Sequence, residues 1–140
     1  CDHTILYKEE DFVEKVKEIT NGEGVPVVYD SVGKDTALKG LDCLSPLGLL
    51  VIFGNSSGNA PAIEPGLLAT KGSLYVTRPT LFSYNSNREK LIDSAEQVFK
   101  MVRENKISIK IGARYRLKDA VQAHKDLENR KTTGSILLIP

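Results

Sequence analysis

Tryptophan is absent from this 140-residue sequence, which also holds one methionine, two histidines and two cysteines. The two cysteines, Cys1 and Cys43, show no CxxC or other spacing suited to a metal or a disulfide. His3 and His124 do not complete a set of three or four zinc ligands with them. We therefore expect no metal site within this chain.

Long hydrophobic runs and an excess of charge are lacking too. No apolar run approaches the roughly 18 residues needed to cross a bilayer, and the N-terminus has no signal-peptide pattern. The net charge is +1, which provides no field for nucleic acid or an anionic membrane. We expect a cytoplasmic protein that binds neither nucleic acid nor a membrane. Because no initiator methionine precedes the first strand-like residues, we also expect a piece of a longer chain.

The most informative segment that is present is the apolar run Leu49–Phe53, which ends abruptly in Gly54–Gly58 (GNSSG). A run without polar alternation predicts a strand covered on both faces, as in a parallel α/β sheet. Glycines in the loop that follows let the backbone come close to a ligand. Ligands of open α/β sheets bind outside the carboxyl ends of the strands, so this loop is the first candidate site.

Strand-like and helical segments alternate along the whole chain. The predicted strands are His3–Tyr7, Val25–Tyr29, Leu49–Phe53, Ser73–Thr77, Ile107–Leu117 and Ser135–Ile139. The first predicted helix has Glu9–Asp11 in its first turn and stops at Asn21-Gly22. The other predicted helices are Asp35–Leu44, Leu67–Lys71, Arg88–Asn105 with Asn87 as its cap, and Leu117–Asn129 with His124 facing inward. This alternation predicts βαβ units and an α/β fold with a mainly parallel sheet.

Five segments in collinear order carry a family resemblance. They are Tyr7, VVYDSVG (Val27–Gly33), FGNSSG (Phe53–Gly58), SLYVTRPTL (Ser73–Leu81) and GSILLIP (Gly134–Pro140). Together they resemble the quinone oxidoreductases, the zinc-independent branch of the medium-chain dehydrogenase/reductase superfamily. The resemblance implies a partial Rossmann-type, doubly wound sheet. Residues 1–110 would be the C-terminal part of the nucleotide-binding domain, and the helix and strand of residues 111–140 would return to the catalytic domain.

The same resemblance implies NADPH as the cofactor and assigns its contacts to Tyr7, Ser31, Phe53, Gly54, Asn55, Ser56, Pro79, Thr80 and Leu81. In the family the tyrosine lies near the 2′-phosphate, and the backbone after the last strand meets the nicotinamide carboxamide. Judged from the residues alone, Tyr7 is more simply an ordinary aromatic at a strand end, and the resemblance makes the two roles about equal. Asp30 more commonly satisfies backbone donors or caps the next helix. No side chain is predicted as an acid, base or nucleophile.

The implied activity is hydride transfer from NADPH to a quinone or a similar conjugated carbonyl compound. The family's glycine-rich nucleotide loop and catalytic domain are not among these residues, so we expect the isolated chain to be inactive. The resemblance also implies a homodimer through the edge strand Ser73–Thr77. Alternatives are a zinc-free enoyl or alkenal reductase, a crystallin-like structural protein, and a generic Rossmann-like domain such as a methyltransferase. The generic Rossmann-like domain is disfavoured by the segment Arg78–Leu81 and by the long C-terminal helix and strand.

Overall fold

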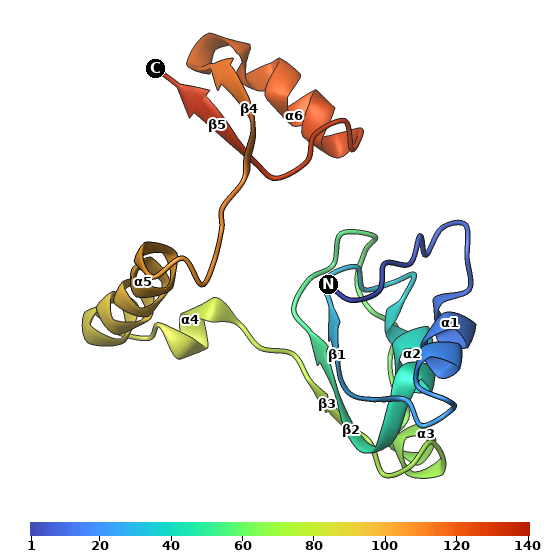
Figure 1. Ribbon diagram of the computed structural model, residues 1–140. Helices are drawn as coiled ribbons and strands as arrows, with labels where there is room; N and C mark the ends of the chain where they lie inside the picture. The colour runs from blue at the N-terminus through green and yellow to red at the C-terminus, as the bar shows by residue number, and fades with distance from the viewer. The chain divides into compact units, whose positions relative to one another are not determined.

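The computed structural model describes every residue from Cys1 to Pro140, in two compact units, Cys1–Ser83 and Tyr84–Pro140 (Figure 1). The helices are α1 (Phe12–Ile19), α2 (Ala37–Gly40), α3 (Pro65–Thr70), α4 (Leu81–Tyr84), α5 (Arg88–Arg103) and α6 (Ala120–Glu128), with 3₁₀ turns η1 (Leu41–Cys43) and η2 (Leu117–Asp119). The strands are β1 (Val25–Asp30), β2 (Leu44–Ile52), β3 (Tyr75–Thr77), β4 (Ile111–Arg116) and β5 (Ser135–Ile139). The domain boundary between residues 110 and 111 stays a prediction.

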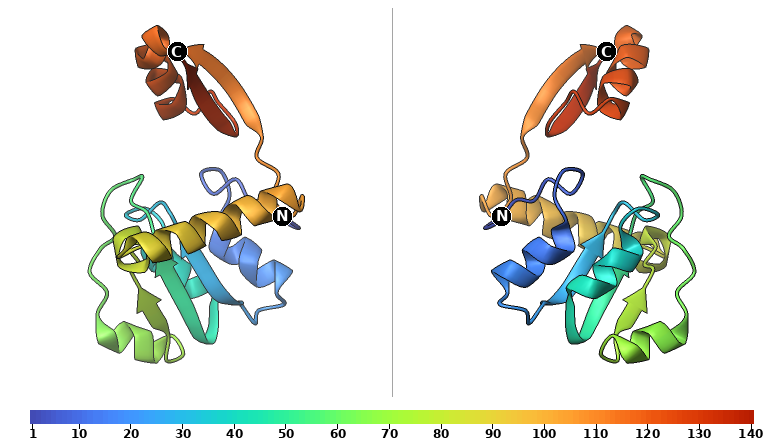
Figure 2. Two further views of the ribbon diagram at one scale, coloured as in Figure 1. Left: turned by 90° about the vertical axis from the view of Figure 1, so that its left-hand side faces the viewer. Right: turned by 90° about the vertical axis from the view of Figure 1, so that its right-hand side faces the viewer.

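The first unit is built on a three-stranded sheet in the order β1-β2-β3, and both strand pairs are parallel (Figure 2). Asp30 at the end of β1 pairs with Ile52, and Val51 pairs with Thr77 at the end of β3. The three strands therefore finish at one edge of the sheet, which we call the carboxyl edge. The predicted α/β class with parallel strands is confirmed, and the apolar run forms the central strand.

The core of this unit lies on one face of β2. Leu50 is fully buried and Ile52 nearly so. Residues from the helical segments, from the start of β2 and from the position before β3 pack against them: Ala37, Leu41, Leu44 and Leu74. Figure 1 shows α1 and α2 on the same side of the sheet. Burial of this face, at about 25 cal/mol per Å² of apolar surface, holds the crossover helices onto the strands.

The predicted strand His3–Tyr7 is wrong. The chain turns at Leu6, whose carbonyl accepts hydrogen bonds from the amides of Glu9 (2.7 Å) and Glu10 (3.0 Å). The Glu10 carboxylate in turn accepts from the Leu6 amide at 3.0 Å. These local bonds use the backbone groups that a strand ladder would need. Asp11 then caps α1, accepting from the Val13 amide at 2.9 Å.

Strand β2 begins five residues before the predicted run. The register of β1 against β2 shifts between Val25 and Val27, which leaves the segment before Leu49 bulged. Leu47 there has a positive φ of 61°, and its amide donates to the Gly72 carbonyl at 2.8 Å. The predicted helix Asp35–Leu44 is correspondingly shorter, ending as α2 and η1 before Leu44 becomes extended.

The second unit contains α5 and the parallel pair β4–β5 with α6. Asn87 caps α5 as predicted, because its side chain accepts from the Lys90 amide at 2.9 Å. The inward position predicted for His124 is wrong, since this side chain is exposed and its neighbour Ala123 is buried. One residue corresponds to about 100° of helix rotation, so burial of Ala123 turns its neighbour outward. No helix in residues 1–140 combines the length and apolar character needed to span a bilayer.

The Tyr115 hydroxyl donates to the Asp126 carboxylate at 3.0 Å and joins β4 to α6. This hydrogen bond raises the pKa of Tyr115 above its ordinary value. The Gln122 side chain donates to the same carboxylate at 3.0 Å, so both carboxylate oxygens are occupied. The Tyr115–Asp126 hydrogen bond therefore fixes α6 against β4, and the Gln122 contact lies within the helix.

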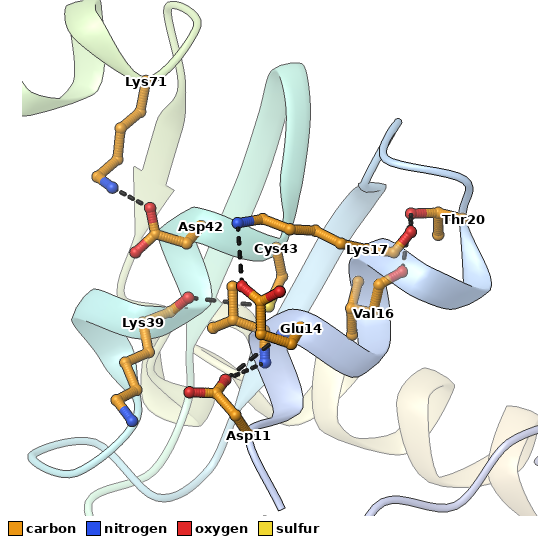
Figure 3. A network of polar contacts seen from close by, with 10 residues as sticks. Asp11, Glu14, Val16, Lys17, Thr20, Lys39, Asp42, Cys43 and Lys71 are labelled. Atoms are coloured by element: carbon orange, nitrogen blue, oxygen red, sulfur yellow. Dashed lines mark hydrogen bonds and ion pairs between the residues drawn. The ribbon is translucent and has the colours of Figure 1, made fainter.

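Cys43 lies at the end of η1 and is buried, and two ion pairs of the first unit are near it (Figure 3). Glu14 pairs with Lys17 at 3.6 Å, and Asp42 pairs with Lys71. The Cys43 thiol donates to the Lys39 carbonyl at 3.8 Å. Burial raises the pKa of this thiol to about 11. The thiol is consequently neutral and shielded at physiological pH.

We predict that iodoacetamide at about pH 8 modifies the exposed Cys1 and leaves Cys43 unmodified in the folded protein, because the thiolate is the reacting species. Mass spectrometry of the alkylated peptides measures both sites. In concentrated guanidinium chloride the two cysteines should react equally. Equal reaction in the folded protein would contradict the buried position of Cys43.

Candidate functional site

The predicted site residues that follow strands are gathered at the carboxyl edge. Ser31 comes directly after β1, Phe53–Ser56 directly after β2, and Pro79–Leu81 shortly after β3. Because the three strands are parallel and in register, their loops leave the sheet side by side. The fold thus brings together residues that lie up to 50 positions apart in the chain.

Hydrogen bonds join the loop after β1 to the loop after β2. The Asp30 carbonyl accepts from the amides of Phe53 (2.8 Å) and Gly54 (3.3 Å). The Ser31 carbonyl accepts from the Ser56 amide at 3.2 Å. These bonds satisfy backbone groups that the sheet no longer pairs, and they fix the two loops as one surface.

Ser57 extends this connection, although the sequence alone did not single it out. Its hydroxyl donates to the Val32 carbonyl at 2.8 Å and accepts from the Asp35 amide at 3.1 Å. The Lys34 amide donates to the Gly58 carbonyl at 3.0 Å. The two serines of GNSSG therefore differ, since the Ser57 side chain holds the loops together.

Asp30 has the structural role that its position predicted. The side chain is buried, with 6% of its surface exposed. One carboxylate oxygen accepts from the amides of Val32 (2.7 Å) and Gly33 (3.0 Å) and from the Thr36 hydroxyl (2.9 Å). All three donors belong to the turn that leads into α2, so this carboxylate shapes the loop and is not free to meet a ligand.

The two loops approach so closely that only glycine fits between them. A Cβ atom on Gly54 would lie 2.4 Å from the Ser31 carbonyl oxygen. One on Gly33, which has a positive φ of 89°, would lie 2.5 Å from the Gly58 carbonyl oxygen. Both contacts are with backbone, which cannot swing aside as a side chain could.

A hollow of about 270 Å³ opens beside β2 at the carboxyl edge. Its lining residues are Ile52, Gly54, Asn55, Asn59, Ala60 and Arg78. The Asn55 side chain donates to the Asn59 side chain at 3.3 Å, and Arg78 Nη1 donates to the Ile52 carbonyl at 2.9 Å. Arg78 and Asn59 were not among the predicted site residues. The signal for Arg78 was its place between the end of β3 and the predicted loop.

A second hollow, of about 230 Å³, opens beside β1. It brings Tyr7 and Ser31 together, and the remaining lining residues are Phe12, Val28, Tyr29, Asp30, Val32, Thr36 and Gly40. The predicted residues Phe53, Ser56, Pro79, Thr80 and Leu81 line neither hollow. Phe53 and Leu81 are instead exposed, and the Thr80 hydroxyl is 3.0 Å from the Ser83 hydroxyl. The assignment of all nine residues to a cofactor stays a prediction.

No group of three or more His, Cys, Asp or Glu side chains in this chain is arranged to hold a metal ion. What the carboxyl edge offers is backbone amides, small hydroxyls, carboxamides and one guanidinium. A parallel sheet with such glycine- and serine-containing loops at its strand ends is the arrangement of Rossmann-type nucleotide-binding domains.

Comparison with known proteins gives the family. The family model described as zinc-binding dehydrogenase matches residues 1–138, and the chain belongs to this family. It is 51% identical over 138 residues to quinone oxidoreductase 1 of Escherichia coli strain K12, covering 97% of this chain and 42% of that protein. It is 44% identical over 141 residues to the 2-haloacrylate reductase of a Burkholderia species, covering 100% of this chain and 42% of that protein.

Solved structures agree with these relatives. The crystal structure of Escherichia coli quinone oxidoreductase complexed with NADPH superposes with a TM-score of 0.89 at 51% identity, covering 97% of this chain and 42% of that one. The resemblance to quinone oxidoreductases and the Rossmann-type fold are thus confirmed. The chain spans about two fifths of the length of the relatives it matches.

We predict that Gly54→Ala lowers the free energy of unfolding by about 1–3 kcal/mol, because the added methyl group forces the two loops apart. Gly66→Ala is the matched control, since a Cβ at Gly66 in α3 meets nothing within 4 Å. This variant should be neutral or stabilising by up to about 1 kcal/mol. Urea unfolding measures both. Equal stability of the two variants would contradict the close approach at Gly54.

Proposed function

We propose that this chain supplies the cofactor-binding loops of an NADPH-dependent oxidoreductase that reduces a quinone or a similar conjugated carbonyl compound. The observation that carries the proposal is the hydrogen-bonded pair of loops at the carboxyl edge, in a chain 51% identical to a quinone oxidoreductase. The related Escherichia coli enzyme has been crystallised with NADPH.

The residues present suit a nucleotide. At Gly54 and Gly33 the two loops approach each other so closely that neither position has room for a side chain, and the paired loops form one surface against which a ligand can lie. Arg78 adds a positive charge to a hollow whose other lining side chains are neutral. The aromatic ring of Tyr7 borders the second hollow. NADPH, when bound, supplies the hydride, and the protein contributes binding and orientation.

Within this proposal, each loop has one task. Tyr7 would lie against the 2′-phosphate, and Ser31 with Phe53–Ser56 would line the ribose and phosphate groups. The backbone of Pro79–Leu81 would orient the nicotinamide through its carboxamide. No side chain of this chain is assigned to proton transfer, so orientation is its contribution to rate.

The proposal extends to assembly. Strand β3 is at an edge of its sheet, and the Tyr75 side chain on it is 59% exposed. An unpaired strand edge readily pairs with another chain. We propose that two copies pair along Ser73–Thr77, and that the protein acts in the cytoplasm on small molecules.

A second candidate is a reductase of an electron-poor carbon–carbon double bond. The 44% identity to a 2-haloacrylate reductase favours it. Both candidates share the cofactor site and differ in the acceptor. Parallel assays with 1,4-benzoquinone and 2-chloroacrylate as acceptors distinguish them.

We predict that the full-length protein containing this chain binds NADPH at least about tenfold more tightly than NADH, since the 2′-phosphate gains charged hydrogen bonds. Calorimetric titration with both nucleotides measures this preference, and oxidation of NADPH in the presence of 1,4-benzoquinone measures the activity.

Tyr7→Phe is the informative variant, because it should weaken NADPH binding and leave NADH binding unchanged. Tyr84→Phe, which removes the hydroxyl of a tyrosine that is 67% exposed on α4 and lines neither hollow, is the matched control. If the wild-type protein binds neither nucleotide, the oxidoreductase proposal fails and a structural, crystallin-like role replaces it.

A further inference from the structure

The end of β2 is held from both neighbouring strands. On the β1 side, the Asp30 carbonyl accepts from the amides of Phe53 and Gly54. On the β3 side, Arg78 Nη1 donates to the Ile52 carbonyl at 2.9 Å. The start of the loop Phe53–Ser56 is therefore restrained from both sides. Its amides donate hydrogen bonds toward β1, and the carbonyl just before it accepts one from Arg78.

Arg78 is suited to this contact for chemical reasons. A guanidinium is always charged and carries five N–H donors in a fixed plane, and hydrogen bonds from charged donors are stronger than neutral ones. No carboxylate lines the hollow that Arg78 borders, so the cation is not neutralised there. The Ile52 carbonyl at the end of the strand is the acceptor that it uses.

Arg78 is also covalently joined to the other predicted loop. Thr77 ends β3 and Pro79 begins the segment Pro79–Leu81, so Arg78 is the residue that joins them. Proline restricts its own φ and the conformation of the residue before it. The direction in which the second loop leaves the sheet is therefore tied to the position of Arg78.

We propose that Arg78 is a positioning residue that sets the two cofactor loops, Phe53–Ser56 and Pro79–Leu81, relative to each other. This inference rests on the proposed NADPH site. Arg78 acts through the Ile52 carbonyl on the loop that contacts the cofactor. Removing its guanidinium leaves both loops in place but lets their spacing vary, and that weakens the hold on the cofactor more than it weakens the fold.

The test compares wild type, Arg78→Met and Arg78→Lys in the full-length protein. Arg78→Met keeps the aliphatic stem and removes every donor, and we expect about a tenfold rise in the Kd and KM for NADPH. Arg78→Lys keeps one charged donor group and should recover part of the loss. Lys39→Met, which removes an exposed cation from α2, is the control and should change neither constant.

A double-mutant cycle separates positioning from direct contact. If Arg78 acts through the loop, the effects of Arg78→Met and Asn55→Ala on Kd will not add, because both disturb the same loop. Additive losses would mean that Arg78 contacts the cofactor independently, and would overturn the inference. An unchanged Kd in Arg78→Met would overturn it as well.

Hydrogen exchange gives a readout that needs no cofactor. Without nucleotide, the Phe53 and Gly54 amides should exchange about tenfold faster in Arg78→Met, whereas the amides of α1 should keep their protection. Uniformly faster exchange would indicate a general loss of stability and overturn the positioning role. If the wild type binds no NADPH, the proposed function fails, and this measurement still decides whether Arg78 holds the loop.

Discussion

The carbonyl and carboxylate of Asp30 are the contacts on which the candidate site depends. The carbonyl receives the first two amides beyond β2, and the carboxylate receives the donors of its own turn. An unpaired buried carboxylate would be costly, so the turn into α2 and the buried charge require each other. Loss of either would release the loops on both sides.

The contacts of Asp30 also determine what the loops after β1 and β2 offer to a ligand. Because the loops after β1 and β2 are drawn together, Gly54 and Gly33 have no room for a side chain, and the Ser57 hydroxyl is used internally. Under the proposed function, such a pair of loops would hold a ligand by shape and backbone groups more than by reactive side chains. The proposed role is of this kind, since the protein orients the cofactor and the cofactor supplies the chemistry.

Much of the fold could be predicted from local pattern. The strands Val25–Tyr29 and Ser135–Ile139 are rich in β-branched or apolar residues, and Asn87 precedes a long amphipathic helix. The errors arose where a local contact or a small rotation decided the outcome. Glu10 bonds back to Leu6 and prevents a strand, and His124 lies one position from the residue that α6 buries.

The candidate site, too, could be predicted from the sequence only in part. The loop after β2 could be located because an apolar run that stops at glycine marks a strand end. The partners of that loop could not, because the hydrogen bond from Arg78 to Ile52 joins residues 26 positions apart and exists only once β3 has paired with β2. Sequence pattern predicts where strands end, whereas strand pairing decides what meets there.

The parallel order of the strands has a consequence for protein synthesis. Parallel neighbours need a long crossover, so each contact of the carboxyl edge waits for a later stretch of chain. The turn of Asp30 can close early, its bonds to Phe53 and Gly54 need the next crossover, and the contact of Arg78 needs another. On the ribosome, where chains grow at about 5–20 residues per second, the edge is therefore assembled in stages over seconds. Until β3 and Arg78 have emerged from the ribosome, the backbone groups of β2 that later pair with β3 remain unpaired.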